Sequence, residues 1–210
     1  MSLRVIRVSS SDPDRGGIEA AVEILRGGGV VAFATDTLYG LAADPRRDEA
    51  VRRVFEAKGR DEKVPIPLVA ADLAQARQLG EFGELDLKLA REFWPGPLTI
   101  VVAATTSVSS AVLAGGTTVG IRVPAHEVAR TLCRCFGSCV TASSANPSGR
   151  PAPATASNLD LDLVSRIDAV LDSGPAPGGA PSTIVTTRSG EVELLREGAI
   201  DWKRVIKSLQ

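Results

Sequence analysis

The run TASSANPSGRPAP, at residues 141–153, is dense in groups that donate and accept hydrogen bonds. Three hydroxyls surround its single amide, Asn146: Ser143, Ser144 and Ser148. A serine nucleophile needs a neighbouring base, but the chain has one histidine and no GxSxG motif. We expect that histidine, His126, to have a structural or surface role, because it lies beside Pro124 at an apparent helix start. The run is therefore interpreted as a hydrogen-bonding loop, with Ser144 and Asn146 facing the same way if the chain is extended there.

Basic side chains form a second group, which suits an anionic ligand. Arg122 lies within the apolar run VGIRV, where an unpaired guanidinium would be costly to bury. A carboxylate or a phosphate would relieve that cost, because arginine offers a bidentate fork to either. Lys58, Arg60 and Lys63 follow a predicted helix, where cations are equally well explained as solvated caps. Since the chain has no GxxxxGK[ST] or GxGxxG motif, a nucleotide would be held by scattered basic side chains, hydroxyls and loop amides.

Apolar periodicity predicts alternating helices and strands that would position these groups. Helices are expected around the apolar stripes at 18–25, 51–55, 85–93, 128–132 and 202–209. Their ends are indicated by the glycines at 27–29, by Gly59 and by the WPGP at 94–97. Strands are expected at 30–34, 98–103, 119–123, 139–142, 169–171 and 182–185, and the VELL that follows suggests a terminal hairpin. The expected fold class is α/β, with one domain over residues 1–210 and a mixed rather than purely parallel sheet.

Four of these strands run directly into small polar or basic residues. The junctions are VVAFATDTLYG, VGIRVP, VTASSANPSG and STIV after its glycine-rich loop. Because ligands of α/β proteins bind in crevices outside strand ends, we expect these junctions to line one cleft. The alternative interpretation is that they are ordinary loops of an α/β protein.

The composition is that of an ordinary globular protein of 210 residues, 44% hydrophobic and 23% charged. A formal net charge of −1 argues against a globally basic nucleic-acid binder, although it leaves room for a local patch. No apolar run approaches the ~20 residues that span a bilayer, and the N-terminus shows no signal-peptide apolar region, so we expect a cytoplasmic location. The three cysteines, Cys133, Cys135 and Cys139, are expected to be buried reduced thiols rather than a zinc site, and no metal site is predicted.

Seven short segments, in order along nearly the whole chain, resemble the YrdC-type threonylcarbamoyl-AMP synthase family. They are TDTLYGL (35–41), KGR (58–60), WPGPLT (94–99), GIRVP (120–124), SSANPSG (143–149), STIV (182–185) and LREGAI (195–200). The resemblance implies a single YrdC-like domain, in the short form without an extra C-terminal domain. Its fold would be a twisted, mixed sheet flanked by helices, with a large concave and positively lined cleft.

The resemblance also implies an activity, that of a nucleotidyltransferase. The enzyme would make threonylcarbamoyl-AMP from L-threonine, bicarbonate or CO2 and ATP, with release of pyrophosphate. Mg²⁺ would be held mainly through the ATP phosphates. A downstream transferase would carry the product to tRNA, where it forms threonylcarbamoyladenosine.

Carried over residue by residue, the resemblance implies two groups of site residues. The threonine-binding residues would be Thr37, Ser182 and Arg122, which would pair with the substrate carboxylate, with Thr35 a weaker candidate. Lys58 and Arg60 would be catalytic and would lie at the ATP phosphates, together with Ser144, Asn146, Arg196 and the weaker candidate Thr118 at the nucleotide.

One departure from the family pattern concerns the phosphate-side loop. Asp61 replaces a proline that relatives usually carry, and Val64 stands where a polar residue is common, so the roles of Lys63 and Val64 do not carry over. Two alternative functions stay open. The first is a module that binds double-stranded RNA or tRNA weakly without forming an adenylate, and the second is a related carbamoyl-adenylate-forming enzyme.

Overall fold

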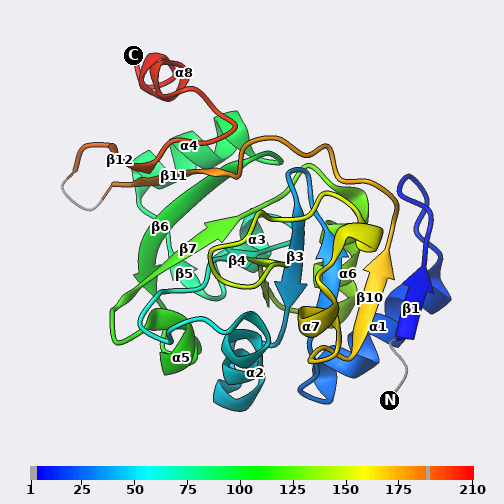
Figure 1. Ribbon diagram of the computed structural model, residues 1–210. Helices are drawn as coiled ribbons and strands as arrows, with labels where there is room; N and C mark the ends of the chain where they lie inside the picture. Colours follow the sequence, from blue (N-terminus) through cyan, green and yellow to red (C-terminus); the bar gives the residue numbers. More distant parts are fainter. Residues whose placement is uncertain (1–3, 188–189) are drawn as a thin grey trace.

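The structure, a computed structural model, describes residues 4–187 and 190–210, and its strands form two mixed sheets (Figure 1). The first sheet has the order β1 (Arg4–Arg7), β10 (Ala169–Asp172), β2 (Val31–Ala34), β3 (Tyr39–Ala42) and β9 (Ser143–Ser144). The second has the order β12 (Glu193–Arg196), β11 (Thr183–Thr186), β6 (Leu98–Ala104), β7 (Thr118–Arg122), β4 (Leu68–Val69) and β8 (Val140–Thr141), and β5 (Gly80–Glu81) pairs with β6. The prediction of a mixed α/β fold is confirmed, with the strands divided between two sheets.

Both sheets combine parallel and antiparallel pairs. In the first, β1, β10 and β2 are parallel, whereas β3 is antiparallel to both β2 and β9. In the second, β11 is parallel to β6 and antiparallel to β12, which confirms the predicted terminal hairpin. Strands β1, β3, β4, β5 and β9 were not expected from the sequence, because they are short or rich in small and polar residues.

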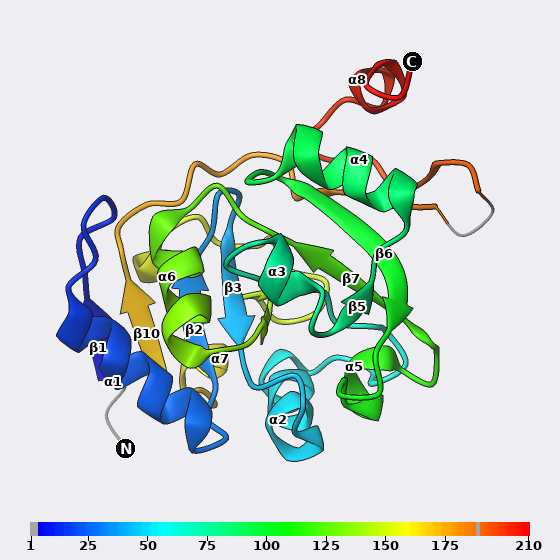
Figure 2. The same cartoon turned by 180° about the vertical axis from the view of Figure 1, so that it is seen from behind.

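Helices pack against both sheets. They are α1 (Arg15–Arg26), α2 (Asp48–Lys58), α3 (Leu73–Ala76), α4 (Glu84–Phe93), α5 (Ser110–Leu113), α6 (Glu127–Phe136), α7 (Leu161–Val164) and α8 (Trp202–Lys207), with a 3-10 turn at Ala156–Asn158. Helices α1 and α6 pack against each other and against the first sheet, and α4 lies against β6 (Figure 2). No helix within the described residues is long and apolar enough to cross a membrane.

Local sequence signals explain where the longer helices begin and end. The Asp14 carboxylate accepts a hydrogen bond of 2.8 Å from the Gly17 amide and so caps α1. Helix α2 ends at Gly59, whose φ of 57° lies in the left-handed region that glycine adopts at low cost. Helix α4 ends before Pro95, as the WPGP run predicted.

The apolar core has two parts. One cluster lies beneath α2, α4 and the second sheet and includes Val54, Phe55, Leu89 and Ile100. The other fills the space between α1, α6 and the first sheet. Because each sheet packs against a buried apolar cluster, the loops at the strand ends are attached to a rigid frame.

Candidate active site

Most of the residues singled out by the sequence line one open pocket with a volume of about 740 Å³. The pocket wall includes Thr35, Thr37, Arg60, Arg122, Ser144, Asn146, Ser182 and Arg196. Within the described residues, the wall does not include Lys58 or Thr118. The pocket thus brings together polar ends of strands from both sheets, while the broad, positively lined cleft implied by the resemblance stays a prediction.

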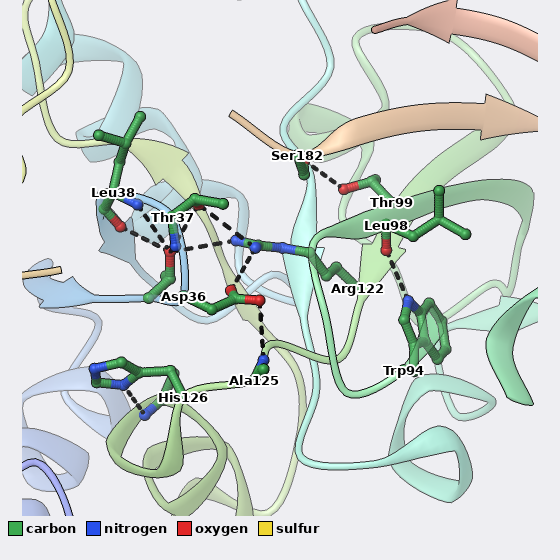
Figure 3. Close-up of polar contacts among 12 residues, drawn as sticks. Asp36, Thr37, Leu38, Trp94, Leu98, Thr99, Arg122, Ala125, His126 and Ser182 are labelled. Atoms are coloured by element: carbon green, nitrogen blue, oxygen red, sulfur yellow. Dashed lines mark hydrogen bonds and ion pairs between the residues drawn. The ribbon is translucent and has the colours of Figure 1, made fainter. Parts of the chain in front are cut away.

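A buried ion pair lies at the end of β7 (Figure 3). The Arg122 Nη1 donates to Asp36 Oδ1 at 2.6 Å, and the two side chains are only 8% and 7% exposed. The Asp36 Oδ2 also accepts a hydrogen bond of 3.0 Å from the Ala125 amide, which ties the β2–β3 turn to the segment after β7. Burial lowers the pKa of the Arg122 guanidinium, and the charge of Asp36 opposes that shift.

Asp36 is a residue of the site that the sequence did not single out. It lies 86 positions before Arg122. The inference that Arg122 needs an anionic partner is correct, but the protein supplies one itself. The sequence carried one signal, since Asp36 is the acidic member of the TDTLYG segment.

The β2–β3 turn is organised by Thr35. Its hydroxyl donates to the Leu38 carbonyl at 2.7 Å and accepts from the amides of Thr37 and Leu38 at 3.2 and 3.3 Å. The hydroxyls of Thr35 and Thr37 lie 3.1 Å apart, and Arg122 approaches them at 3.4 and 3.5 Å respectively. Thr35 is therefore committed to the turn, and Thr37 keeps more of its hydrogen-bonding capacity for a ligand.

A second arginine reaches the pocket from β12, where Arg196 contacts Ser182. The Arg196 Nη2 donates to the Ser182 carbonyl at 2.8 Å and to its Oγ at 3.2 Å. The Ser182 Oγ also lies 2.9 Å from the hydroxyl of Thr99 on β6, a pocket residue that was not singled out although it ends the WPGPLT segment (Figure 3). Partial burial and the nearby Arg122 lower the pKa of Arg196, which indicates two cations facing the same space.

Arg60 and the loop after β9 also line the pocket. The Arg60 Nη1 donates to Ser143 Oγ at 3.2 Å, so Ser143, interpreted as loop structure or a secondary contact, is a buried strand residue that contacts an arginine. Exposed Arg150 also lines the pocket and forms an ion pair with Asp160. Of the family departures, Val64 lines the pocket and is 43% exposed, while the carboxylate of Asp61 accepts from the Lys63 amide at 3.0 Å.

Lys58 and Thr118 do not join the other candidates in the pocket wall. Lys58 is 4% exposed, and its ammonium donates to the carbonyl oxygens of Ser144 and Asn146. Thr118 begins β7, two and four residues before the pocket residues Gly120 and Arg122, so it shares their face of the strand but lies farther along it.

His126 and the cysteines have the locations of structural residues, with one exception. The Nδ1 of His126 accepts from the Ala129 amide at 3.4 Å at the start of α6, and burial lowers the pKa of this imidazole. Cys133 and Cys139 are buried as expected, but Cys135 is exposed, so the prediction is wrong for that residue. The described residues contain no group of three or more histidine, cysteine or acidic side chains that could hold a metal.

Comparison with known proteins identifies relatives over most of the chain. The model of the Sua5/YciO/YrdC family, described as telomere recombination, matches residues 23–198. A threonylcarbamoyl-AMP synthase of Bacillus subtilis is 38% identical over 200 residues, which cover 94% of this chain and 57% of that protein. The chain also spans 56% and 54% of the synthases of Pyrococcus abyssi and Schizosaccharomyces pombe, little more than half their length. It covers 90% of a Halorhodospira halophila synthase, to which it is 38% identical over 172 residues.

Solved structures share the fold. The crystal structure of P. abyssi Sua5 complexed with L-threonine matches with a TM-score of 0.93 and 35% identity, over 98% of this chain and 60% of that one. Escherichia coli YciO matches with a TM-score of 0.88 over 96% of this chain and 98% of its own, and at 23% identity it supports the fold alone. With a family match over most of its length and relatives at this level of identity, the chain belongs to the Sua5/YciO/YrdC family.

Proposed function

We propose that this chain forms threonylcarbamoyl-AMP from L-threonine, bicarbonate or CO2 and ATP, with release of pyrophosphate. The observation that carries the proposal is one pocket lined by arginines and hydroxyls. Arg122 and Arg196 lie beside the hydroxyls of Thr37 and Ser182, and Arg60 lies beside that of Ser143. Such a pocket suits a small carboxylate beside a nucleotide phosphate. The names of the relatives, and the L-threonine bound to P. abyssi Sua5, support the same assignment.

The threonine carboxylate is proposed to bind between Arg122 and Arg196. Asp36 already holds one side of the Arg122 fork, so the substrate takes remaining N–H groups of that guanidinium. The hydroxyls of Thr37, Thr99 and Ser182 line the same pocket and are proposed to orient the amino acid. The second arginine then adds a positive charge that Asp36 does not balance.

The reaction depends mainly on positioning and charge. The deprotonated amine of threonine adds to CO2 to give a carbamate, whose oxygen attacks the α-phosphorus as the bond to pyrophosphate breaks. Arg60 is proposed to stabilise the departing pyrophosphate, and Ser144 and Asn146 are proposed to lie at the nucleotide. Thr118 is the weakest of these candidates, because it lies outside the pocket wall.

Mg²⁺ is proposed to enter as the complex with ATP. No carboxylate lines the pocket among the described residues, and hydroxyl, amide and arginine groups do not make a Mg²⁺ cage. The donors available to the ion are therefore the phosphate oxygens, and the chain's own contribution is to hold those phosphates.

Two further assignments belong to the proposal. We propose that the product passes to a transferase acting on tRNA and that the protein is cytoplasmic. The alternatives, weak binding of double-stranded RNA or tRNA without adenylate formation and a related carbamoyl-adenylate enzyme, have less support, since the relatives at 32–38% identity carry the threonylcarbamoyl-AMP synthase name.

The test is pyrophosphate release from MgATP and bicarbonate, with and without L-threonine. We expect release to require threonine and to fall sharply in Arg122→Ala. Arg91→Ala is the matched control, because Arg91 is an exposed arginine on α4 outside the pocket wall. Release that is absent, or equal without threonine, would overturn the proposal.

A further inference from the structure

The C-terminal end of α2 is joined to the 144–150 loop through a single residue, Lys58. The Lys58 ammonium donates to the Ser144 carbonyl and, at 2.7 Å, to the Asn146 carbonyl. The Lys58 carbonyl in turn accepts from the Ser148 amide at 2.9 Å. Lys58 thus holds the loop at three points, two through its side chain and one through its backbone. The two ammonium contacts join residues that are 86 and 88 positions apart in the chain.

The interior of the loop is closed by Asn146. Its Nδ2 donates to the Pro147 carbonyl at 3.0 Å and to the Arg150 carbonyl. Both N–H groups of the amide are therefore used inside the loop, and its Oδ1 lies 3.4 Å from the Lys58 ammonium. Lys58 and Asn146 together form the inner support. The Ser144 hydroxyl lines the pocket and lies 3.4 Å from the Lys58 ammonium, and Arg150, which is paired with Asp160, lines the pocket as well.

The position of Lys58 does not suit a phosphate contact. Its side chain is almost fully buried, and the described pocket wall does not contain it. Moving the ammonium to a phosphate would take the Lys58 donor from the Asn146 carbonyl and would leave the Ser144 carbonyl with the Asn146 amide alone, and losing a donor is costly for buried groups. Burial and the nearby Arg60 lower the pKa of Lys58 to about 8, whereas the two carbonyl oxygens favour the charged form.

We infer that Lys58 is a positioning residue, which holds the 144–150 loop in the shape that presents Ser144 and Arg150 to the nucleotide and does not itself touch the phosphates. The inference rests on the proposed function only for the identity of the ligand. The contacts that support it are present in the chain without any ligand.

The experiment compares two ligands that differ only in phosphate, adenosine and MgATP, by titration calorimetry. Lys58→Met removes the ammonium and keeps an unbranched apolar side chain that is one atom shorter. Lys58→Gln supplies N–H donors without charge, and Arg60→Met is the matched cationic control. In parallel, amide hydrogen exchange of residues 144–150 is measured without ligand, which needs no assumption about function.

If Lys58 positions the loop, Lys58→Met weakens adenosine and MgATP by the same factor, about 10- to 100-fold. Loop exchange rises at the same time, and Lys58→Gln restores part of both properties. Arg60→Met weakens MgATP and leaves adenosine binding unchanged. A phosphate contact would give the opposite pattern for Lys58→Met, with adenosine affinity and loop exchange as in the wild type, and that result would overturn the inference.

The two proposals fail separately. If the wild type bound neither ligand, the proposed function would be refuted, and loop exchange alone would decide the role of Lys58. Circular dichroism shows whether Lys58→Met folds, and if it does not, Lys58→Gln is used for the same comparison. In that variant, a selective loss of MgATP binding with unchanged amide exchange of residues 144–150 would overturn the inference.

Discussion

Removing the carboxylate of Asp36 tests the buried ion pair on which the candidate active site is built. Asp36→Ala leaves Arg122 with its charge, in a position where the side chain is 8% exposed and the nearest anion is gone. The Ala125 amide loses its acceptor as well, but Ala125 is exposed and water can replace that bond. The main cost therefore falls on the guanidinium.

The expected magnitude follows from the geometry of the pair. With N and O 2.6 Å apart, the charge centres lie at a separation for which an effective dielectric constant near 20 gives about 4 kcal/mol. Breaking one side of a buried pair costs about 3–5 kcal/mol in proteins, in agreement with that figure. We expect Asp36→Ala to lower the free energy of unfolding by this amount. That is a large share of the total free energy of unfolding of a typical domain, which is ~5–15 kcal/mol.

The assay is urea unfolding of four chains: wild type, Asp36→Ala, Arg122→Met and the double variant. Because the double variant removes the unpaired charge, it should be less destabilised than the sum of the single variants by about 2 kcal/mol or more. A loss below about 1 kcal/mol in Asp36→Ala, or additive single losses, would refute the reasoning that Arg122 depends on Asp36.

Three further predictions concern the pocket and its supports. Arg122→Lys removes the planar fork, so threonine affinity should fall about 10- to 100-fold with ATP affinity unchanged, as measured by calorimetry. Gly198→Ala would place a Cβ 2.2 Å from the Pro181 carbonyl oxygen and 2.6 Å from that of Ser182. It should therefore cost about 1–3 kcal/mol in thermal unfolding and raise the threonine KM, whereas an unchanged KM would contradict a role for this contact. The pKa of Lys58 is lowered from 10.5 to about 8, so the unfolded chain binds more protons than the folded chain between these pH values. The stability of the wild type relative to Lys58→Met should therefore rise by up to about 3 kcal/mol from pH 8 to 10.5. A stability difference in urea unfolding that does not change with pH would refute this prediction.

Elements with long apolar periods were predictable from the sequence. The stripe of α1, the glycine stop of α2 and the WPGP stop of α4 each carry local signals that act within a few residues. By contrast, β3 and β9 were missed because the TDTLYG and SSAN segments are polar or contain glycine. Strand β9 pairs with β3, about 100 positions earlier in the chain, and no local pattern reports such a partner. Strand β3 also pairs with its neighbour β2, but its glycine and the polar turn before it hide the alternation of a hairpin.

The candidate site shows the same division between local and distant information. Arg122 was identified from one local fact, a cation inside an apolar strand. Its partner Asp36 and the carbonyl partners of Lys58 lie 86 or more positions away, and their identity depends on how two sheets meet. For this reason the sequence predicted which residues gather in the pocket better than what each of them contacts.

The ion pair also changes how the pocket must attract an anion. Asp36 balances the charge of Arg122, so Arg122 supplies directed N–H groups more than net charge. The net charge comes from Arg196, which is held by the neutral groups of Ser182. Burial lowers the pKa of Arg196, and the charge of Arg122 lowers it further, so the two cations repel each other and would gain from an anion placed between them. The proposed threonine carboxylate, placed between the two arginines, would relieve this repulsion.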